Sequence, residues 1–327
     1  MPDFVKPQIS AAGVEFLEQN CETRQQLQSV AGDAEVVWLF GGSRILNGNL
    51  DAIPRCCSIL RTGSGTDNVP VAEATHRGIL VANTPAAVAV AVADHAIAMI
   101  LALSRRLVEM DRAVRSAAAH DSQIRPRVEI SGKVIGLVGF GHIARLMARR
   151  VSGFDVTVVA ADPFVPAEEM ARHNVTKLEL ADVLSCADFV SVHCPLSAAT
   201  FHLIGEPQLR SMKPTAYLVN TSRGPVVDEL ALIHALESGT LAGAGLDVFE
   251  DETAEVSPAL RALDNVVLSF HLAGYAEENI VRRWRFSVEA VIDLVNGRCP
   301  RSCVNPEVKP RWKMTVDDGA RTAERRA

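Results

Sequence analysis

Short apolar runs along the chain alternate with segments whose apolar positions repeat at helical spacing. In the first eighty residues, the runs at 36–40, 56–61 and 79–82 predict strands, and residues 69–77 predict a helix. Only residues 3–6 remain for an opening strand. This alternation is typical of an α/β domain.

A second alternating series starts near residue 133. Six apolar runs in it predict strands, at residues 134–137, 156–160, 189–193, 216–220, 243–246 and 266–269. Helical segments fill most of the gaps, so we expect a doubly wound parallel sheet. Residues 88–119 predict one long helix, or two in tandem, and residues 277–295 predict a final amphipathic helix.

Composition and charge narrow the classes of protein. The chain is 48% hydrophobic with a net charge of −6 and has no basic block, which argues against a nucleic-acid partner. The most apolar stretch, residues 86–103, contains Asp94 and His95. Since a charged side chain at the centre of a bilayer costs about 3 kcal/mol on insertion scales, we expect a buried helix and no membrane partner. Seven cysteines without a CxxC or a completed zinc pattern predict free thiols, no metal site and a cytoplasmic location.

A glycine-rich turn follows the first strand of the second series. Gly139, Gly141 and Ala144 occupy the three positions of the dinucleotide fingerprint, in which two glycines let the backbone approach a pyrophosphate. Asp162 follows the next strand, about twenty residues further on, where a carboxylate accepts hydrogen bonds from the adenosine ribose and repels a 2′-phosphate. The sequence therefore predicts a dinucleotide site that prefers NAD. An ordinary turn at Asp162-Pro163 is the alternative interpretation.

Three polar residues follow later strands of this series, namely Arg223, Glu252 and His271. The carboxyl ends of parallel strands form the ligand crevice of an open α/β sheet, so these residues could converge there. An arginine can hold a 2-oxo acid through its planar fork, and a histidine can exchange a proton with the carbonyl oxygen. A glutamate beside that histidine would fix its tautomer. The alternative is that each is an ordinary surface residue.

Six sequence blocks together resemble one known family. They are RTGSGTDNV at residues 61–69, VANTP at 81–85, HCPL at 193–196, NTSRGPVVD at 220–228, AGLDVFEDE at 244–252 and HLAGY at 271–275. In this order they resemble the D-isomer-specific 2-hydroxyacid dehydrogenases, which include phosphoglycerate dehydrogenases and hydroxypyruvate reductases. The resemblance extends over residues 38–306.

The resemblance implies an α/β fold of two domains. A Rossmann-type NAD-binding domain with a doubly wound parallel sheet, residues 99–295, would be inserted into a smaller flavodoxin-like substrate-binding domain. That smaller domain would be discontinuous and formed by residues 1–98 and 296–327. The implied protein is a homodimer that transfers a hydride between the nicotinamide of NAD and C2 of a small D-2-hydroxy acid or 2-oxo acid.

The resemblance also assigns roles to residues. It implies that Arg223 clamps the substrate and that Glu252 and His271 form the acid–base pair. Substrate binding is implied for Arg61, Ser64, Gly65 and Arg223, with the amides around Ser64 and Gly65 on the carboxylate. Cofactor contacts are implied for Gly139, Gly141, His142, Ile143, Asp162, Cys194, Pro195, Thr200, Thr221, Asp247, His271 and Gly274.

Four positions depart from the family pattern. Phe270 and Thr253 stand where the family usually has proline, before the histidine and after the glutamate of the pair. His142 replaces an arginine near the pyrophosphate. Phe40 stands where members that act on phosphoglycerate carry an arginine. The loss of that cation disfavours a phosphorylated substrate and favours glyoxylate, hydroxypyruvate or another small 2-oxo acid.

Two other functions compete with this hypothesis. The fold is shared by a corepressor that senses NAD(H) and binds partner proteins, and the sequence is compatible with such a role. It is also compatible with a dehydrogenase that takes its hydride from phosphite and keeps the same trio. Formate dehydrogenases of this architecture use a Gln–His pair, so Glu252 argues against them.

Overall fold

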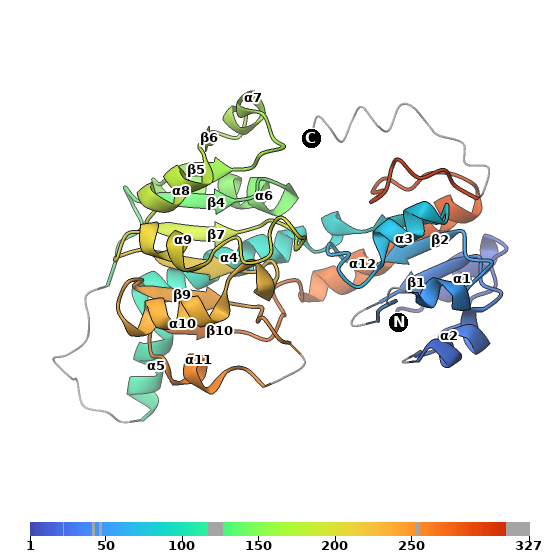
Figure 1. Cartoon of the computed structure of the whole chain (residues 1–327), viewed down its shortest axis with the longest axis horizontal. Helices are drawn as coiled ribbons and strands as arrows, with labels where there is room; N and C mark the ends of the chain where they lie inside the picture. Colours follow the sequence, from blue (N-terminus) through green and yellow to red (C-terminus); the bar gives the residue numbers. More distant parts are fainter. Residues whose placement is uncertain (22, 41–42, 46–47, 117–126, 253–254, 312–327) are drawn as a thin grey trace. The chain divides into compact units, whose positions relative to one another are not determined.

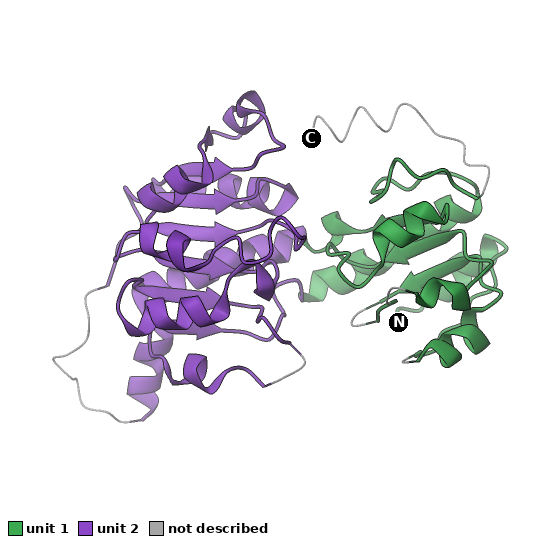
Figure 2. Ribbon diagram, in the orientation of Figure 1, with its two compact units in different colours: residues 1–88, 276–327 green, residues 89–275 purple. Residues whose placement is uncertain are grey.

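The computed structural model describes residues 1–21, 23–40, 43–45, 48–116, 127–252 and 255–311. The chain forms two compact units. The smaller unit contains residues 1–88 together with the segment that begins at residue 276, and the larger unit contains residues 89–275 (Figure 2). Both units are α/β with parallel sheets, as the sequence predicted.

The larger unit is built on seven parallel strands (Figure 1). They are β4 (Val134–Val138), β5 (Thr157–Ala161), β6 (Thr176–Lys177), β7 (Phe189–Val192), β8 (Tyr217–Asn220), β9 (Gly243–Leu246) and β10 (Val266–Leu268). Their order is β10-β9-β8-β7-β4-β5-β6, which reverses direction at β4 and makes the sheet doubly wound. All six predicted strands are present. The sequence missed β6, which is only two residues long and lies beside β5 at the edge of the sheet.

Helices cover both faces of this sheet. On one face, α4 (Ala89–Arg105) and α6 (His142–Val151) pack over strand residues that include Ile135 and Leu137. On the other face, a second core contains Val138 together with residues of α8 (Leu180–Cys186), α9 (Glu206–Ser211) and α10 (Glu229–Glu237). Successive residues of β4 therefore enter opposite cores, as the two-residue period of a strand requires. Two short helices, α7 (Ala167–Ala171) and α11 (Pro258–Ala262), complete the unit.

The predicted helical region after residue 88 consists of two helices in tandem. α4 ends at Arg105, and α5 (Leu107–Arg115) begins two residues later. Arg106 between them has a left-handed backbone with φ of 53°, which interrupts the helix. Residues 117–119 of the predicted region lie outside the described part of the chain. No helix in the described residues is long and apolar enough to cross a bilayer, and Asp94 of α4 pairs with Arg150 of α6 at 2.7 Å.

The smaller unit holds a parallel sheet of three strands, in the order β1 (Val36–Leu39), β2 (Ser58–Arg61) and β3 (Leu80–Asn83). One face carries a core shared with α2 (Arg24–Ala31), the 3-10 helix η1 (Asn49–Ala52) and α3 (Val71–His76). The other face is covered by α1 (Val5–Ala11) and α12 (Glu277–Val295). These two faces give the unit its own pair of cores.

Residues 3–6 do not form the opening strand that the sequence predicted. Residues from 5 onward form α1 instead, and its two buried side chains, Val5 and Ile9, are four residues apart. That spacing puts both on one face of a helix, where they pack against Leu60, Val288 and Val291. The prediction was wrong because four residues are too few to distinguish a period of two from one of 3.6.

The unit boundaries differ from the domain limits expected at residues 98 and 295. The first half of α4 packs in the larger unit, where Ala93 and Ala96 join the core of Ile135. α12 packs in the smaller unit through residues such as Leu294. After α12 the chain continues along β3, since Cys303 forms an antiparallel bridge with Ala82.

Candidate active site

The glycine-rich loop after β4 has the geometry of a phosphate-binding turn. Gly139 has φ of 91°, and a Cβ there would lie 2.8 Å from the backbone nitrogen of Cys194. Only glycine therefore lets the loops after β4 and β7 touch. Gly141 caps the start of α6 with open space around its Cα, and Ala144 is fully buried. The helix N-terminus and the bare backbone suit the pyrophosphate of a dinucleotide.

Asp162 lies after β5 and holds this loop. Its carboxylate accepts the backbone N–H of Phe140 at 2.8 Å and that of Phe164 at 2.9 Å. A carboxylate offers about four acceptor positions, so Asp162 can also accept ribose hydroxyls. Next to the loop, the His142 side chain is exposed at the first turn of α6, and Ile143 packs partly against the core.

The loop after β7 is fixed by hydrogen bonds of the Thr200 hydroxyl. Thr200 Oγ1 donates to the Pro195 carbonyl at 2.6 Å and accepts the Ser197 N–H at 2.8 Å, which fixes the turn. Burial raises the pKa of the Cys194 thiol to about 11, so this cysteine stays protonated and is a poor nucleophile. Burial also lowers the pKa of His193 to about 4, and its neutral ring lies 3.3 Å from Met147 Sδ.

The hydroxyl of Thr221 supports a ligand at the end of β8. Within the described structure, its Oγ1 is buried and makes no hydrogen bond, although the residue directly follows the strand. Buried polar atoms are nearly always satisfied, so this hydroxyl is suited to meet a bound group. The glycine cradle at Gly139 and this hydroxyl together fit a dinucleotide across the carboxyl ends of the strands.

Arg223 stands on a loop that is rigidly held. At the end of β8, the buried Asn220 accepts the Ser222 N–H at 3.0 Å and donates to the Arg223 carbonyl at 2.9 Å. A Cβ at Gly224 would lie 1.8 Å from the Phe249 carbonyl oxygen, so this position requires glycine. The guanidinium also donates to the Ser222 carbonyl at 2.7 Å. The loop that carries Arg223 is thus packed against the segment that leads to Glu252.

Glu252 and His271, which the sequence proposed as an acid–base pair, lie within hydrogen-bond distance of each other. Glu252 Oε2 lies 2.8 Å from His271 Nδ1, and both side chains are about two-fifths exposed, at 40% and 43%. A carboxylate at Nδ1 holds the proton on that nitrogen, so Nε2 is the nitrogen that can exchange a proton with a substrate. Phe270 beside the pair is exposed. Thr253 lies outside the described residues.

The backbone of His271 is held in an unusual conformation by Asp247. His271 has φ of 54°, and its N–H donates to the Asp247 carbonyl at 2.6 Å. The Asp247 carboxylate is fully buried and accepts Ser269 Oγ at 2.6 Å, Leu272 N–H at 2.9 Å and Ala273 N–H at 2.8 Å. Its hydrogen bonds thus lie on both sides of the histidine. The family resemblance implies a cofactor contact for Asp247, and in the structure its carboxylate is bound within the loop of His271.

Two histidines of the site were not singled out from the sequence. His95 of α4 bonds Ser269 Oγ at 3.0 Å through Nε2 and lies 3.7 Å from the Asp247 carboxylate. His202 bonds Glu250 Oε1 at 2.8 Å through Nε2, and its backbone N–H donates to the Pro225 carbonyl at 2.8 Å. The position of His95 in the middle of an apolar helix was one sequence signal that could have indicated a role in the site. No local sequence pattern indicated such a role for His202.

Three of the four predicted substrate residues lie in the smaller unit: Arg61 is the last residue of β2, and Ser64 and Gly65 lie on the loop that follows it. Asn83 at the end of β3 donates to the Ser64 carbonyl at 2.7 Å, and the Gly63 N–H donates to Thr84 Oγ1 at 2.8 Å. Ser64 is exposed and Gly65 is half-buried, while the Arg61 guanidinium folds back onto the Thr62 carbonyl. The loop is therefore fixed from β3, with its tip open.

Phe40 lies against α12 in the same unit. Its ring stacks on that of Trp284, with centroids 4.5 Å apart and planes at 17°. The Arg283 guanidinium lies 5.0 Å above the Phe40 ring. Two stacked aromatic rings, with the Arg283 guanidinium over one of them, therefore stand at the end of β1.

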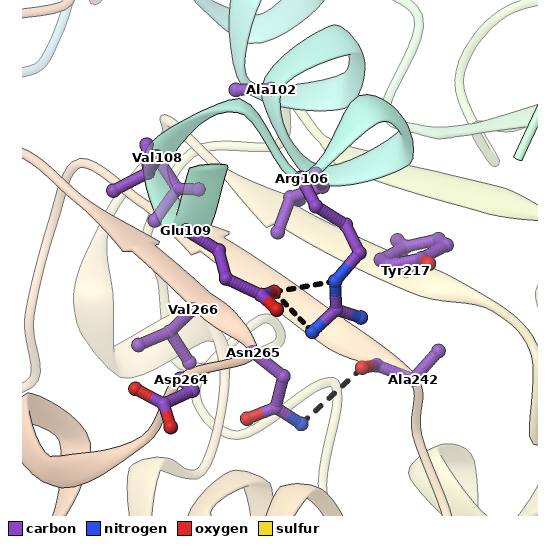
Figure 3. A pocket seen from close by; sticks show the side chains of 11 residues that line it. Ala102, Arg106, Val108, Glu109, Tyr217, Ala242, Asp264, Asn265 and Val266 are labelled. Atoms are coloured by element: carbon purple, nitrogen blue, oxygen red, sulfur yellow. Dashed lines mark hydrogen bonds and ion pairs between the residues drawn. The ribbon is translucent and has the colours of Figure 1, made fainter. Parts of the chain in front are cut away.

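A pocket elsewhere in the larger unit contains none of the predicted site residues. It lies at the amino ends of β8 and β10, beside Tyr217 and Val266. Arg223 and His271 follow the carboxyl ends of these strands, so the pocket is at the other end of the strands. Figure 3 shows Arg106 and Glu109 pointing toward each other in it. The ion pair occupies the pocket, and we assign it no ligand. Among the described residues, no cluster of histidine, cysteine and carboxylate side chains could hold a metal ion.

A dinucleotide loop on a doubly wound sheet, with a histidine–carboxylate pair at the strand ends, defines an NAD-binding oxidoreductase. Residues 97–273 match the family described as D-isomer specific 2-hydroxyacid dehydrogenase, NAD binding domain. The chain belongs to this family and is an NAD-dependent 2-hydroxyacid dehydrogenase.

Several relatives of known name support this assignment. A glyoxylate reductase of Korarchaeum cryptofilum is 41% identical over 261 residues, which cover 79% of each chain. An NADPH-dependent glyoxylate/hydroxypyruvate reductase from Sinorhizobium meliloti, solved with NADP and malonate, has a TM-score of 0.82, 27% identity and coverage of 94% and 96%. D-Lactate dehydrogenase from Aquifex aeolicus, solved with NAD and lactic acid, has a TM-score of 0.77, 28% identity and coverage of 91% and 94%.

Proposed function

We propose that this enzyme reduces a small, unphosphorylated 2-oxo acid to the D-2-hydroxy acid with NADH, and that glyoxylate or hydroxypyruvate is the substrate. The observation that carries the proposal is the 2.8 Å contact between Glu252 and His271, on a loop fixed by the buried Asp247. The similarity to glyoxylate reductases supports the choice of substrate.

In the proposed mechanism the bound cofactor supplies the hydride. Arg223 binds the substrate carboxylate and carbonyl oxygen through its planar guanidinium, which also stabilises negative charge on that oxygen. His271, protonated on both nitrogens, donates the Nε2 proton to the oxygen as the carbonyl carbon is reduced. Glu252 keeps the Nδ1 proton in place, so the imidazole is left neutral with a defined tautomer. The reverse reaction uses the same neutral imidazole as the base.

Residues of the smaller unit support the choice of a small, unphosphorylated substrate. We propose that the backbone amides near Ser64 and Gly65 bind the carboxylate, with Arg61 beside them. Phe40 and Trp284 present apolar rings after β1. Phe40 itself offers a phosphate group no cation and no hydrogen-bond donor, and the nearby Arg283 guanidinium is stacked over its ring, so we infer that an unphosphorylated substrate is preferred.

The test is a panel of 2-oxo acids, assayed by NADH oxidation. We expect turnover of glyoxylate and hydroxypyruvate, and at least about a hundredfold loss of kcat/KM in Arg223→Ala, because one charge-stabilising donor is removed. Arg210→Ala, on an exposed face of α9, is the matched control. Near-normal turnover by Arg223→Ala, with NADH still bound, would show that the proposed clamp is wrong.

We further propose a cytoplasmic homodimer. The seven cysteines are all free thiols, which suits a reducing compartment. α5 has no buried residue and exposes Leu107 and Val114, which favours a second copy as its partner. A monomer's mass in sedimentation would contradict the dimer.

A further inference from the structure

Glu169 of α7 is a buried carboxylate that faces several basic groups. Its Oε1 lies 2.9 Å from Arg145 Nη1, and its Oε2 lies 2.6 Å from Arg172 Nη1. His173 Nε2 is 3.7 Å from Oε1. The Glu169 side chain is only 11% exposed and that of Arg145 only 20%, so water screens the contact between these two weakly. The mechanism above uses none of these residues.

This cluster lies directly against the residue that joins the glycine loop to Asp162. Arg145 Nε donates to the Phe140 carbonyl at 3.3 Å, and its guanidinium lies 5.7 Å from the centre of the Phe140 ring. The Phe140 N–H is the group that donates to Asp162. His173 meets the same ring edge-on at 5.7 Å. Arg145 and Asp162 therefore bind opposite ends of one residue, Phe140.

The two forms of the cofactor differ only by a phosphate on the adenosine ribose. A carboxylate at the end of the second strand favours the free hydroxyl, and an arginine nearby accommodates the 2′-phosphate. This chain brings both kinds of group to the glycine loop, because Asp162 and Arg145 bind the same residue, Phe140, and Arg172 shares the Glu169 carboxylate with Arg145. A guanidinium already paired with a carboxylate has less of its charge and fewer of its donors available for a phosphate.

We propose that Glu169 is a cofactor-selectivity residue. It holds Arg145 and Arg172 in ion pairs. The negative charge of Asp162 then determines the electrostatic potential at the adenosine ribose, and NADH is preferred to NADPH. The inference rests on the proposed use of NADH and adds a residue on α7, outside the glycine loop and the strand that ends before Asp162.

The experiment measures dissociation constants of NADH and NADPH without substrate, from the fluorescence of the reduced nicotinamide. Glu169→Gln should move the ratio of the two constants toward NADPH by about tenfold, which corresponds to one favourable charge contact. Arg145→Gln added to Glu169→Gln should cancel most of that gain. Glu168→Gln is the matched control, since it removes the same charge from an exposed neighbour on α7 and should leave the ratio unchanged.

A second variant covers the case in which Glu169→Gln unfolds. Arg172 has a side chain that is 67% exposed, and Arg172→Glu should lower NADPH affinity several-fold with little change for NADH. A constant ratio in folded Glu169→Gln or in Arg172→Glu would overturn the inference, as would an equal shift in Glu168→Gln. If the parent enzyme bound neither dinucleotide, the proposed function itself would fail. If the parent enzyme bound both dinucleotides and the variants left the ratio of the two dissociation constants unchanged, only the proposed role of Glu169 would be wrong.

Discussion

At the scale of single residues, the buried Asp247 does the most to shape the site. It accepts three hydrogen bonds, from Ser269, Leu272 and Ala273, and its own carbonyl accepts the His271 N–H. These contacts hold the histidine at a positive φ, which costs on the order of 1 kcal/mol or more outside glycine. A carboxylate is well suited to this position because the three groups bound to it, one hydroxyl and two backbone N–H groups, are all hydrogen-bond donors.

We expect Asp247→Asn to weaken both catalysis and folding. The amide nitrogen would face at least one backbone N–H, so a buried donor would lose its acceptor at a cost of about 1–3 kcal/mol in the free energy of unfolding. The loop of His271 would relax, and kcat should fall about tenfold or more. Thermal unfolding and steady-state kinetics measure the two effects. Asp264→Asn is the control, because Asp264 is exposed and precedes β10, at the amino ends of the strands. Normal kcat in folded Asp247→Asn would refute this role.

At the scale of elements, the loops that carry Arg223 and Glu252 are held together by hydrogen bonds from a third segment. His202 bonds Glu250 through its ring and Pro225 through its backbone. The Glu250 carboxylate accepts the Glu229 N–H at 3.1 Å, and the Glu229 carboxylate accepts the Glu250 N–H at 3.0 Å. The segment after Arg223 and the segment before Glu252 are therefore joined side by side. Tertiary contacts of this kind fix the relative placement of two side chains that no single element controls.

His202 should thus act as a positioning residue. We expect His202→Ala to lower kcat by about ten- to a hundredfold, since displacements near 1 Å have effects of that size. The dissociation constant for NADH should not change. His202→Gln keeps a donor for Glu250 and should restore part of kcat, which a purely structural role would not explain. Phe201→Ala removes only the ring stacked on His202 and serves as the control. Equal activity of the alanine and glutamine variants would show that the hydrogen bond between His202 and Glu250 does not position these loops.

At the scale of the whole molecule, the chain closes each unit with contacts between distant parts of the sequence. In the smaller unit, Thr62 bonds Ser287 at 2.8 Å, and Asn305 accepts the Val81 N–H at 2.8 Å. Segments that are more than 200 positions apart in the sequence therefore contact each other at its sheet. In the larger unit, His193 and Asp188 flank the central strand β7. Hydrogen bonds from the Val134 N–H and Lys213 lower the pKa of Asp188 against the opposing effect of burial.

The stability of the fold should fall in mild acid. His193 has a folded pKa of about 4 against an ordinary value of 6.5, so the unfolded chain binds a proton between these pH values and the folded chain does not. The free energy of unfolding should then decrease with falling pH, by at most about 1.4 kcal/mol per pH unit from this residue. Asp188, with its lowered pKa, adds a loss at still lower pH. Denaturant melts of the parent and of His193→Gln between pH 7 and pH 4 would show the slope, which should be shallower in the variant. Parallel slopes would show that His193 is not responsible.

The sequence alone determined the alternating elements and the glycine loop, and it proposed Arg223, Glu252 and His271 as a group at the strand ends. Each of these follows from local periodicity or from the short spacing of a few residues. α12 and the six strands are therefore found close to the predicted residues. Only the tertiary structure decided the hydrogen-bond partners of Asp247, Glu169 and His202. Those contacts join side chains up to 48 positions apart, and the type of a residue does not say which distant group it will meet. The same reason explains α1, because packing against α12 and β2 selected a helix where four residues of sequence could not.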